Sequence, residues 1–170
     1  MIIIVMGVSG SGKTTVGKLL ADSCGWEFSD ADNFHSKENI EKMGRGIPLS
    51  EADRIPWLQD LQTAIKHWLQ ENKNVVLACS ALKDSYRQFL TFDSAIHQDC
   101  FQNNYVQIVY LKGSYEIIQK RLQERENHYM SEILLDSQFD TLEEPLNSIS
   151  MDIQNSPQVI VEDIRAVLNI

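Results

Sequence analysis

The sequence has few cysteines and no C-x-x-C pair, which argues against two classes of protein. Its 170 residues contain three cysteines, an odd number, and they are widely spaced. We therefore expect neither a disulfide-stabilised secreted domain nor a cysteine-ligated metal site, but reduced thiols in a cytoplasmic protein. The hydrophobic content of 43% is enough to bury a core without such crosslinks.

Positive charge is also scarce, since 15 Lys and Arg face 24 Asp and Glu, for a net charge of −9. Nucleic acids and anionic membranes bind through basic faces, so we expect neither as a partner. The apolar run Ile2–Met6 is too short to span a bilayer or to serve as a signal peptide. No repeat or linker interrupts the sequence, so residues 1–170 are expected to form a single domain.

Short apolar runs alternate along the chain with segments of helical period, and this order predicts an α/β fold with a mostly parallel sheet. Five strands are expected, at Ile2–Met6, Trp26–Ser29, Val75–Cys79, Tyr105–Leu111 and Ile149–Ile153, and the first and third of them are expected to be buried. Helices are expected at Lys13–Cys24, from Trp57 with Pro56 in the first turn, and at Ala81–Leu90, Ser114–Arg125, Ser131–Phe139 and Pro157–Leu168. Trp57 and Trp68 fall on the apolar face of their helix, which predicts core packing.

The most informative segment lies between the first strand and the first helix and fits the pattern G-x-x-x-x-G-K-[ST]. Glycines allow backbone angles closed to other residues, and the following helix presents its positive end to a bound phosphate. We expect the lysine to reach the β- and γ-phosphates and the threonine hydroxyl to bind Mg²⁺. The segment is Gly7-Val8-Ser9-Gly10-Ser11-Gly12-Lys13-Thr14, and Thr15 follows it. The sequence therefore predicts a nucleoside triphosphate site.

Three classes of nucleotide protein carry such a loop: small-molecule kinases, GTPase switches, and motor or regulatory ATPases. A GTPase is expected to carry N-K-x-D after a later strand, but Asn72–Val75 lacks the aspartate and precedes a strand. A motor ATPase usually ends a buried strand in an acidic residue, whereas Val75–Cys79 is followed by Ser80. Both absences favour a small-molecule kinase.

Two carboxylates, Asp30 and Asp32, directly follow the second expected strand. The carboxyl ends of parallel strands are where α/β folds place their ligands, so both acids are expected beside the phosphate loop. One of them can hold the hydration shell of Mg²⁺ while the other accepts a proton from an attacking hydroxyl. The residues alone leave open which acid has which role.

Several blocks of the sequence together resemble the gluconokinases, which are small relatives of shikimate and nucleoside monophosphate kinases. The most specific blocks are CSALK at Cys79–Lys83, GIPLSEADRIPWL ending at Leu58, and SQFDTLEEP at Ser137–Pro145. The resemblance implies a three-layer α/β/α P-loop kinase fold with a five-stranded sheet. It also implies a substrate-gripping helical region at about 34–58 and a mobile lid at about 121–137. The implied reaction is ATP-dependent phosphorylation of gluconate at its 6-hydroxyl, with Mg²⁺, in a chain that can form a homodimer.

The resemblance also implies roles for individual residues. Asp32 would grip the reactive hydroxyl and act as base, with Asp30 nearer the metal. Arg54 would bind the acceptor carboxylate through its planar fork of N–H groups. Arg121 would lie against adenine, and Arg125 would neutralise the transferred phosphoryl group beside Lys13. The remaining acceptor contacts would come from His35, Ser80, Lys83, His128 and Gln138.

Four points stay open at this stage. Arg54 can instead pair with the neighbouring acids, and His35 can instead cap a helix. Arg87 is as well explained by a solvated surface charge as by a role in the site. An adenine pocket around Asn155–Pro157 follows only by analogy with related kinases. A kinase for another sugar acid or a polyol and a non-catalytic ATP-sensing protein remain the alternative functions.

Overall fold

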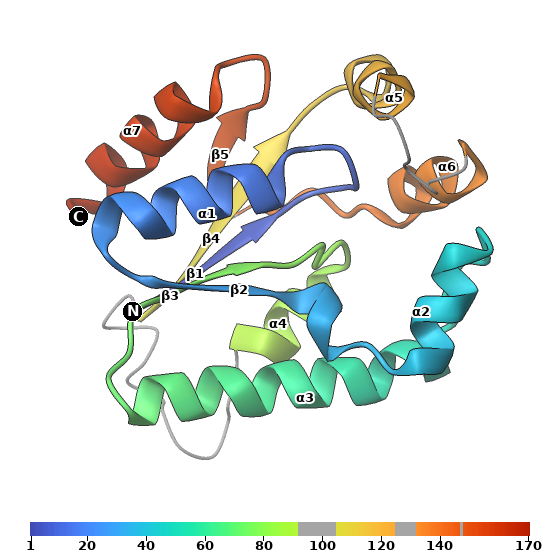
Figure 1. Cartoon of the computed structure of the whole chain (residues 1–170), viewed down its shortest axis with the longest axis horizontal. Helices are drawn as coiled ribbons and strands as arrows, with labels where there is room; N and C mark the ends of the chain where they lie inside the picture. The colour runs from blue at the N-terminus through green and yellow to red at the C-terminus, as the bar shows by residue number, and fades with distance from the viewer. Residues whose placement is uncertain (92–104, 125–131, 147) are drawn as a thin grey trace.

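A parallel sheet with helices on both faces forms the centre of the molecule (Figure 1). The structure is a computed structural model, and it describes residues 1–91, 105–124, 132–146 and 148–170. In these residues five strands form one sheet in the order β2-β3-β1-β4-β5, and every pair of neighbours is parallel. The strands are β1 (Ile2–Met6), β2 (Glu27–Asp30), β3 (Val75–Ala78), β4 (Val106–Lys112) and β5 (Ile149–Asp152). The α/β fold and its parallel sheet are thus confirmed.

Strand β1 lies at the middle of the sheet and is buried on both faces, as its unbroken apolar run predicts. Its side chains alternate between two cores. Ile3 and Val5 pack into the core shared with α1 (Lys13–Cys24) and α7 (Pro157–Leu168). Ile4 and Met6 pack into the opposite core, shared with α3 (Glu51–Gln70) and α4 (Asp84–Thr91).

From β1 the chain runs to the edge strand β2 and then to β3, and from β3 it crosses to β4 on the other side of β1, so the direction of the connections reverses between β3 and β1. A reversal of this kind opens a crevice at the carboxyl ends of the strands. The remaining helices gather at that end: η1 (Ala31–Phe34), α2 (Lys37–Gly44), α5 (Tyr115–Gln123) and α6 (Glu132–Thr141) (Figure 1).

Helix α3 begins six residues before the predicted start at Trp57. Ser50 caps it, and Ser50 and Asp53 form a capping box in which each side chain receives the other's backbone N–H. Lys42 on α2 adds an ion pair to Asp53 at 2.6 Å. Pro56 therefore lies inside the helix and not in its first turn. The prediction was wrong because the capping signal outweighs the preference of proline for a helix start.

Helices α2 and η1 were not predicted individually, although the region 34–58 was expected to be helical. Both are short and polar, so no apolar period marks them. Within the described residues, none of the helices has the length and apolar character needed to cross a membrane.

Candidate active site

The phosphate loop joins β1 to α1 as predicted. Gly10 and Gly12 have φ values of +84° and +99°, which L-residues with a side chain rarely adopt. Lys13 folds back over the loop, and its Nζ donates to the Val8 carbonyl at 3.0 Å. Because α1 starts at Lys13, its positive end faces the loop, and the segment has the geometry of an anion site.

Asp30 links the phosphate loop to the turn that carries Asp32. The Thr14 hydroxyl donates to Asp30 Oδ2 at 3.1 Å, and the Asp32 backbone N–H donates to Asp30 Oδ1 at 3.1 Å. Thr14 and Asp30 thus bring two hard oxygen atoms together at the end of the loop, a combination that suits Mg²⁺, which takes few protein ligands and keeps several waters. Among the described residues, His, Cys, Asp and Glu form no cluster of three or more that could hold a metal ion.

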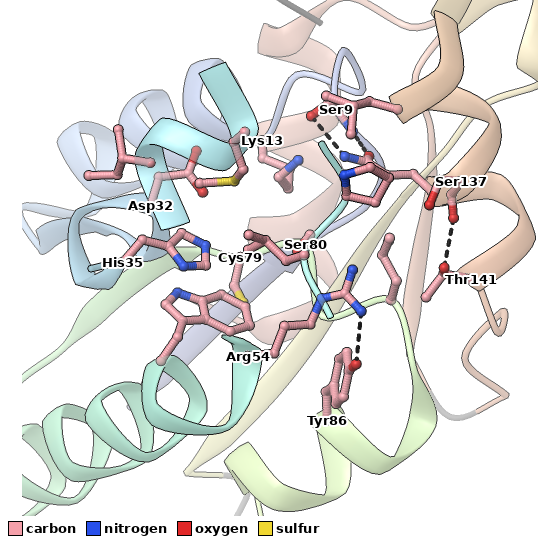
Figure 2. Close-up of a pocket in the computed structure, with 18 of the residues that line it drawn as sticks. Ser9, Lys13, Asp32, His35, Arg54, Cys79, Ser80, Tyr86, Ser137 and Thr141 are labelled. Atoms are coloured by element: carbon pink, nitrogen blue, oxygen red, sulfur yellow. Dashed lines mark hydrogen bonds between the residues drawn. The ribbon is translucent and has the colours of Figure 1, made fainter. Parts of the chain in front are cut away.

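A cavity of about 520 Å³ opens beside the loop at the carboxyl ends of β1, β2 and β3 (Figure 2). Residues from the phosphate loop, η1, α2, α3, the end of β3, α4 and α6 line it. The predicted site residues among them are Ser9, Lys13, Asp30, Asp32, His35, Arg54, Ser80 and Gln138. One cavity therefore receives both acids, the loop lysine and the expected carboxylate-binding arginine.

Trp57 and His35 form one wall of this cavity. Their rings stack with centroids 4.7 Å apart and an angle of 10° between the planes. Trp57 Nε1 also donates to the Ala31 carbonyl at 2.8 Å, which ties α3 to the turn bearing Asp32. Burial lowers the pKa of His35, as does Arg54, against the opposing effect of Asp32. Core packing of Trp57 is confirmed, and the same side chain also shapes the site.

The turn after β3, which carries Ser80, is held from inside by Arg87. Ala81 has a φ of +42°, an unusual value for alanine. Arg87 Nη1 donates to the carbonyls of Ala81 at 3.0 Å and Leu82 at 2.9 Å, and only 3% of Arg87 is exposed. Of the two interpretations left open for Arg87, the solvated surface charge is therefore wrong, because the guanidinium on α4 is buried beneath this turn.

Arg54 reaches the cavity, but the structure does not place Lys83 among the lining residues. Lys83 Nζ is bound to the Glu51 carboxylate at 2.5 Å. Arg54 Nη1 donates to the Tyr86 hydroxyl at 3.3 Å and lies 3.6 Å from the same carboxylate (Figure 2). Arg54 therefore forms a local ion pair with Glu51 and also lines the cavity.

Helix α6 contacts both the phosphate loop and the turn after β3. The Ser9 backbone N–H donates to Gln138 Oε1 at 2.6 Å. Five residues beyond Gln138, after the end of α6, the Glu143 backbone N–H donates to the Leu82 carbonyl at 2.9 Å. The Glu143 carboxylate accepts the backbone N–H of Asp84, the first residue of α4, at 2.5 Å. The block Ser137–Pro145 therefore braces two sides of the cavity.

A second cavity of about 310 Å³ lies on the other side of the phosphate loop. The predicted residues Gly10, Ser11, Gly12, Thr15 and Arg121 line it together with Asn155 and Pro157. Arg121 Nη2 donates to the Ile153 carbonyl. The structure therefore places Arg121 beside the segment that analogy with related kinases assigns to adenine.

Two predicted residues, Arg125 and His128, lie outside the described residues, as does much of the expected lid. The sequence predicted no role for Tyr86, and it predicted Glu51 only as a neighbouring acid with which Arg54 can pair. The sequence holds no local signal for their contact, because they are 35 residues apart and meet only in the folded chain.

The phosphate loop, the paired acids and the parallel sheet define the class: the protein is a P-loop small-molecule kinase. A family model described as shikimate kinase matches residues 9–166. A probable gluconokinase of Xenopus tropicalis is 46% identical over 176 residues, covering 96% of this chain and 91% of the relative. A gluconokinase of Arabidopsis thaliana is 43% identical, with 96% and 89% covered.

A solved structure agrees with these relatives. The crystal structure of a gluconokinase from Sinorhizobium meliloti 1021 has a TM-score of 0.80 and 38% identity, covering 98% of this chain and 90% of that one. The chain belongs to the gluconokinases, within the shikimate kinase family of P-loop kinases.

Proposed function

We propose that the protein transfers the γ-phosphoryl group of Mg·ATP to the 6-hydroxyl of gluconate, giving 6-phosphogluconate and ADP. The observation that carries the proposal is the cavity of about 520 Å³, because it gathers Lys13, Asp32 and Arg54 around one space. A phosphoryl acceptor needs a hydroxyl beside the phosphate loop, and a sugar acid also needs a cation for its carboxylate. The gluconokinase relatives supply the identity of the acceptor.

In this proposal the acceptor lies between α3 and the phosphate loop. Arg54 binds its carboxylate, and Asp32 accepts the proton of the attacking hydroxyl. His35, Ser80 and Gln138 contact its other hydroxyl groups. Catalysis rests mainly on positioning and charge neutralisation, because phosphoryl transfer asks for little covalent chemistry from the protein.

ATP lies along the phosphate loop, with its adenosine in the second cavity beside Arg121 and Asn155. Lys13 neutralises charge on the β- and γ-phosphates. Thr14 and Asp30 are the residues that would hold Mg²⁺, and the ion would offset the negative charge of the phosphates there. The acidic chain thus concentrates some of its scarce cations where two anionic substrates meet.

A coupled assay of ADP release over a panel of acceptors tests the proposal. The panel contains gluconate, other sugar acids, a polyol without a carboxylate, shikimate and nucleoside monophosphates. We expect turnover with gluconate and a ³¹P NMR signal from a primary phosphate ester at carbon 6. Turnover of shikimate or a nucleotide with none of gluconate would overturn the assignment.

A cytoplasmic location is proposed from the few, unpaired cysteines, and a homodimer from the family resemblance alone. Fractionation of the cells that make the protein tests the first. Analytical ultracentrifugation of the purified chain tests the second, and a single sedimenting species of 19.4 kDa would contradict it.

A further inference from the structure

The side chains of Tyr86 and Glu51 contact each other next to the guanidinium of Arg54. The Tyr86 hydroxyl lies 2.8 Å from each oxygen of the Glu51 carboxylate, to which it donates its proton. The same hydroxyl oxygen accepts the hydrogen bond from Arg54 Nη1 at 3.3 Å. Because a hydroxyl has only one proton, its donation to Glu51 leaves the lone pairs free to face the guanidinium.

The positions of the two partners are set in different ways. Tyr86 is only 7% exposed and packs into the core beneath α3. Glu51 is 57% exposed but stands in the first turn of α3. Burial and the contact with Glu51 raise the pKa of Tyr86, while Lys83 and Tyr86 hold the pKa of Glu51 below its usual range. At neutral pH the hydroxyl is therefore protonated and the carboxylate is charged.

Lys83 also contacts Glu51 and Tyr86, so that Arg54, Glu51, Tyr86 and Lys83 form one cluster. Its Nζ lies 2.5 Å from Glu51 Oε1 and 5.6 Å from the centre of the Tyr86 ring. The guanidinium of Arg54 lies 5.9 Å from the same ring centre. The negative face of an aromatic ring attracts a cation at this distance. Glu51 balances one of the two cations, so the group keeps one net positive charge, which matches an acceptor with one carboxylate.

Arginine has a long side chain, and fixing it in one conformation costs rotamer entropy. If the side chain became fixed only when the acceptor binds, this cost would subtract from the free energy of binding, and the acceptor would bind more weakly. Here the buried tyrosine already anchors one amino group of Arg54. Among the described residues the hydrogen bond and the ion pair of Arg54 both involve Nη1, so the other N–H groups of the planar fork remain for a ligand in the cavity.

We propose that Tyr86 and Glu51 are positioning residues that hold the guanidinium of Arg54 ready for the acceptor carboxylate. Lys83 serves the same cluster by neutralising Glu51 and does not contact the acceptor itself. The inference rests on the proposed function, because it takes Arg54 as the residue that binds the carboxylate.

A double-mutant cycle tests this inference. Tyr86→Phe removes one hydroxyl and keeps the ring, so the fold should persist. We expect it to raise the KM for gluconate about 5- to 10-fold, the effect of losing one hydrogen bond that orders a charged group, and to leave the KM for ATP unchanged. In an Arg54→Ala background the same change should alter the KM for gluconate less than 2-fold, because the residue through which Tyr86 acts is gone. An unchanged KM in the single variant, or an equal effect in both backgrounds, would overturn the inference.

Glu51 gives a second, independent series. Glu51→Ala should match Tyr86→Phe, whereas Glu51→Gln should recover part of the loss because the amide oxygen still accepts the tyrosine proton. Tyr105→Phe and Glu41→Gln are the matched controls, since both residues are exposed and neither lines the cavity. A merely structural role would lower the melting temperature and change the two KM values together, which contradicts the proposal.

The acceptor panel separates this inference from the proposed function. If the wild-type protein phosphorylates another acid and not gluconate, the proposed function fails and the cycle is run with that acid. If gluconate is phosphorylated and Tyr86→Phe has no effect on its KM, only the inference fails. If no acid is phosphorylated, both are overturned.

Discussion

Gln138 on α6 and Ser9 in the phosphate loop are joined by two contacts, although 129 residues separate them in the sequence. The backbone N–H of Ser9 donates to Gln138 Oε1 at 2.6 Å, and Gln138 Nε2 lies 3.4 Å from Ser9 Oγ. Both side chains line the larger cavity. The position of α6 is therefore tied to the loop that is expected to hold the triphosphate.

Gln138→Ala should lower kcat/KM for gluconate about 3- to 10-fold, since it removes a hydrogen bond worth about 1 kcal/mol between α6 and the loop. Steady-state kinetics with both substrates varied measure the change. The matched control is Gln123→Ala, because Gln123 is exposed on α5 and lines neither cavity. Equal kinetics for the two variants would show that the contact has no part in turnover.

Asp32→Asn should reduce kcat by a factor on the order of 10² or more, because an amide cannot accept the proton of the attacking hydroxyl. Binding of a non-hydrolysable ATP analogue, measured by calorimetry, should be nearly unchanged. Asp60→Asn on the exposed face of α3 serves as the control. Wild-type turnover in Asp32→Asn would remove this residue from the role of base.

Arg87→Met should lower the free energy of unfolding by about 2–4 kcal/mol, because it leaves the carbonyls of Ala81 and Leu82 without their buried donor. Urea unfolding at pH 7 followed by circular dichroism measures the loss. Arg45→Met removes an arginine that is 73% exposed in its side chain and should change stability by less than about 0.5 kcal/mol. A loss of similar size in both variants would contradict the structural role of Arg87.

The stability of the protein should rise with pH just below neutrality through His35. Its pKa is lowered in the folded state, chiefly by burial, whereas an unfolded histidine titrates near about 6.5. Between these two values the unfolded chain binds more protons, so the contribution is full above about 6.5 and declines as the pH falls toward the folded pKa. Urea unfolding from pH 5 to 7.5 should show a weaker pH dependence for His35→Phe than for the wild type. Parallel curves would contradict this expectation.

The sequence predicted the sheet and the phosphate loop well because both depend on local patterns. Strands β1 and β3 are unbroken, fully buried apolar runs, and the loop carries its own glycines and lysine. The start of α3 also has a local signal, the capping box of Ser50 and Asp53. The sequence prediction relied instead on Pro56 as a mark of the first turn. The choice between a strong cap and a proline inside the first two turns is decided by hydrogen bonds that only the fold displays.

The arrangement around Arg54 could not be predicted in the same way. The burial of Arg87 and the contact between Glu51 and Tyr86 depend on how α3 packs against α4, and no spacing in the sequence records that packing. The placement of Lys83 outside the cavity follows from the same contact, because Glu51 holds its amino group. Resemblance to a family indicates which residues belong to the site, but the structure is needed to show which of them lines the cavity and which holds a neighbour in place.

The two cavities have no lining residue in common within the described part of the chain, and the phosphate loop forms the wall between them. In the proposed arrangement the adenosine and the acceptor therefore occupy separate compartments, and only the phosphates of ATP pass from one to the other. A bisubstrate inhibitor must cross that wall. Its linker would have to follow the path of the phosphates past Lys13, and an adenosine joined to a sugar acid by a shorter route could fill one compartment only.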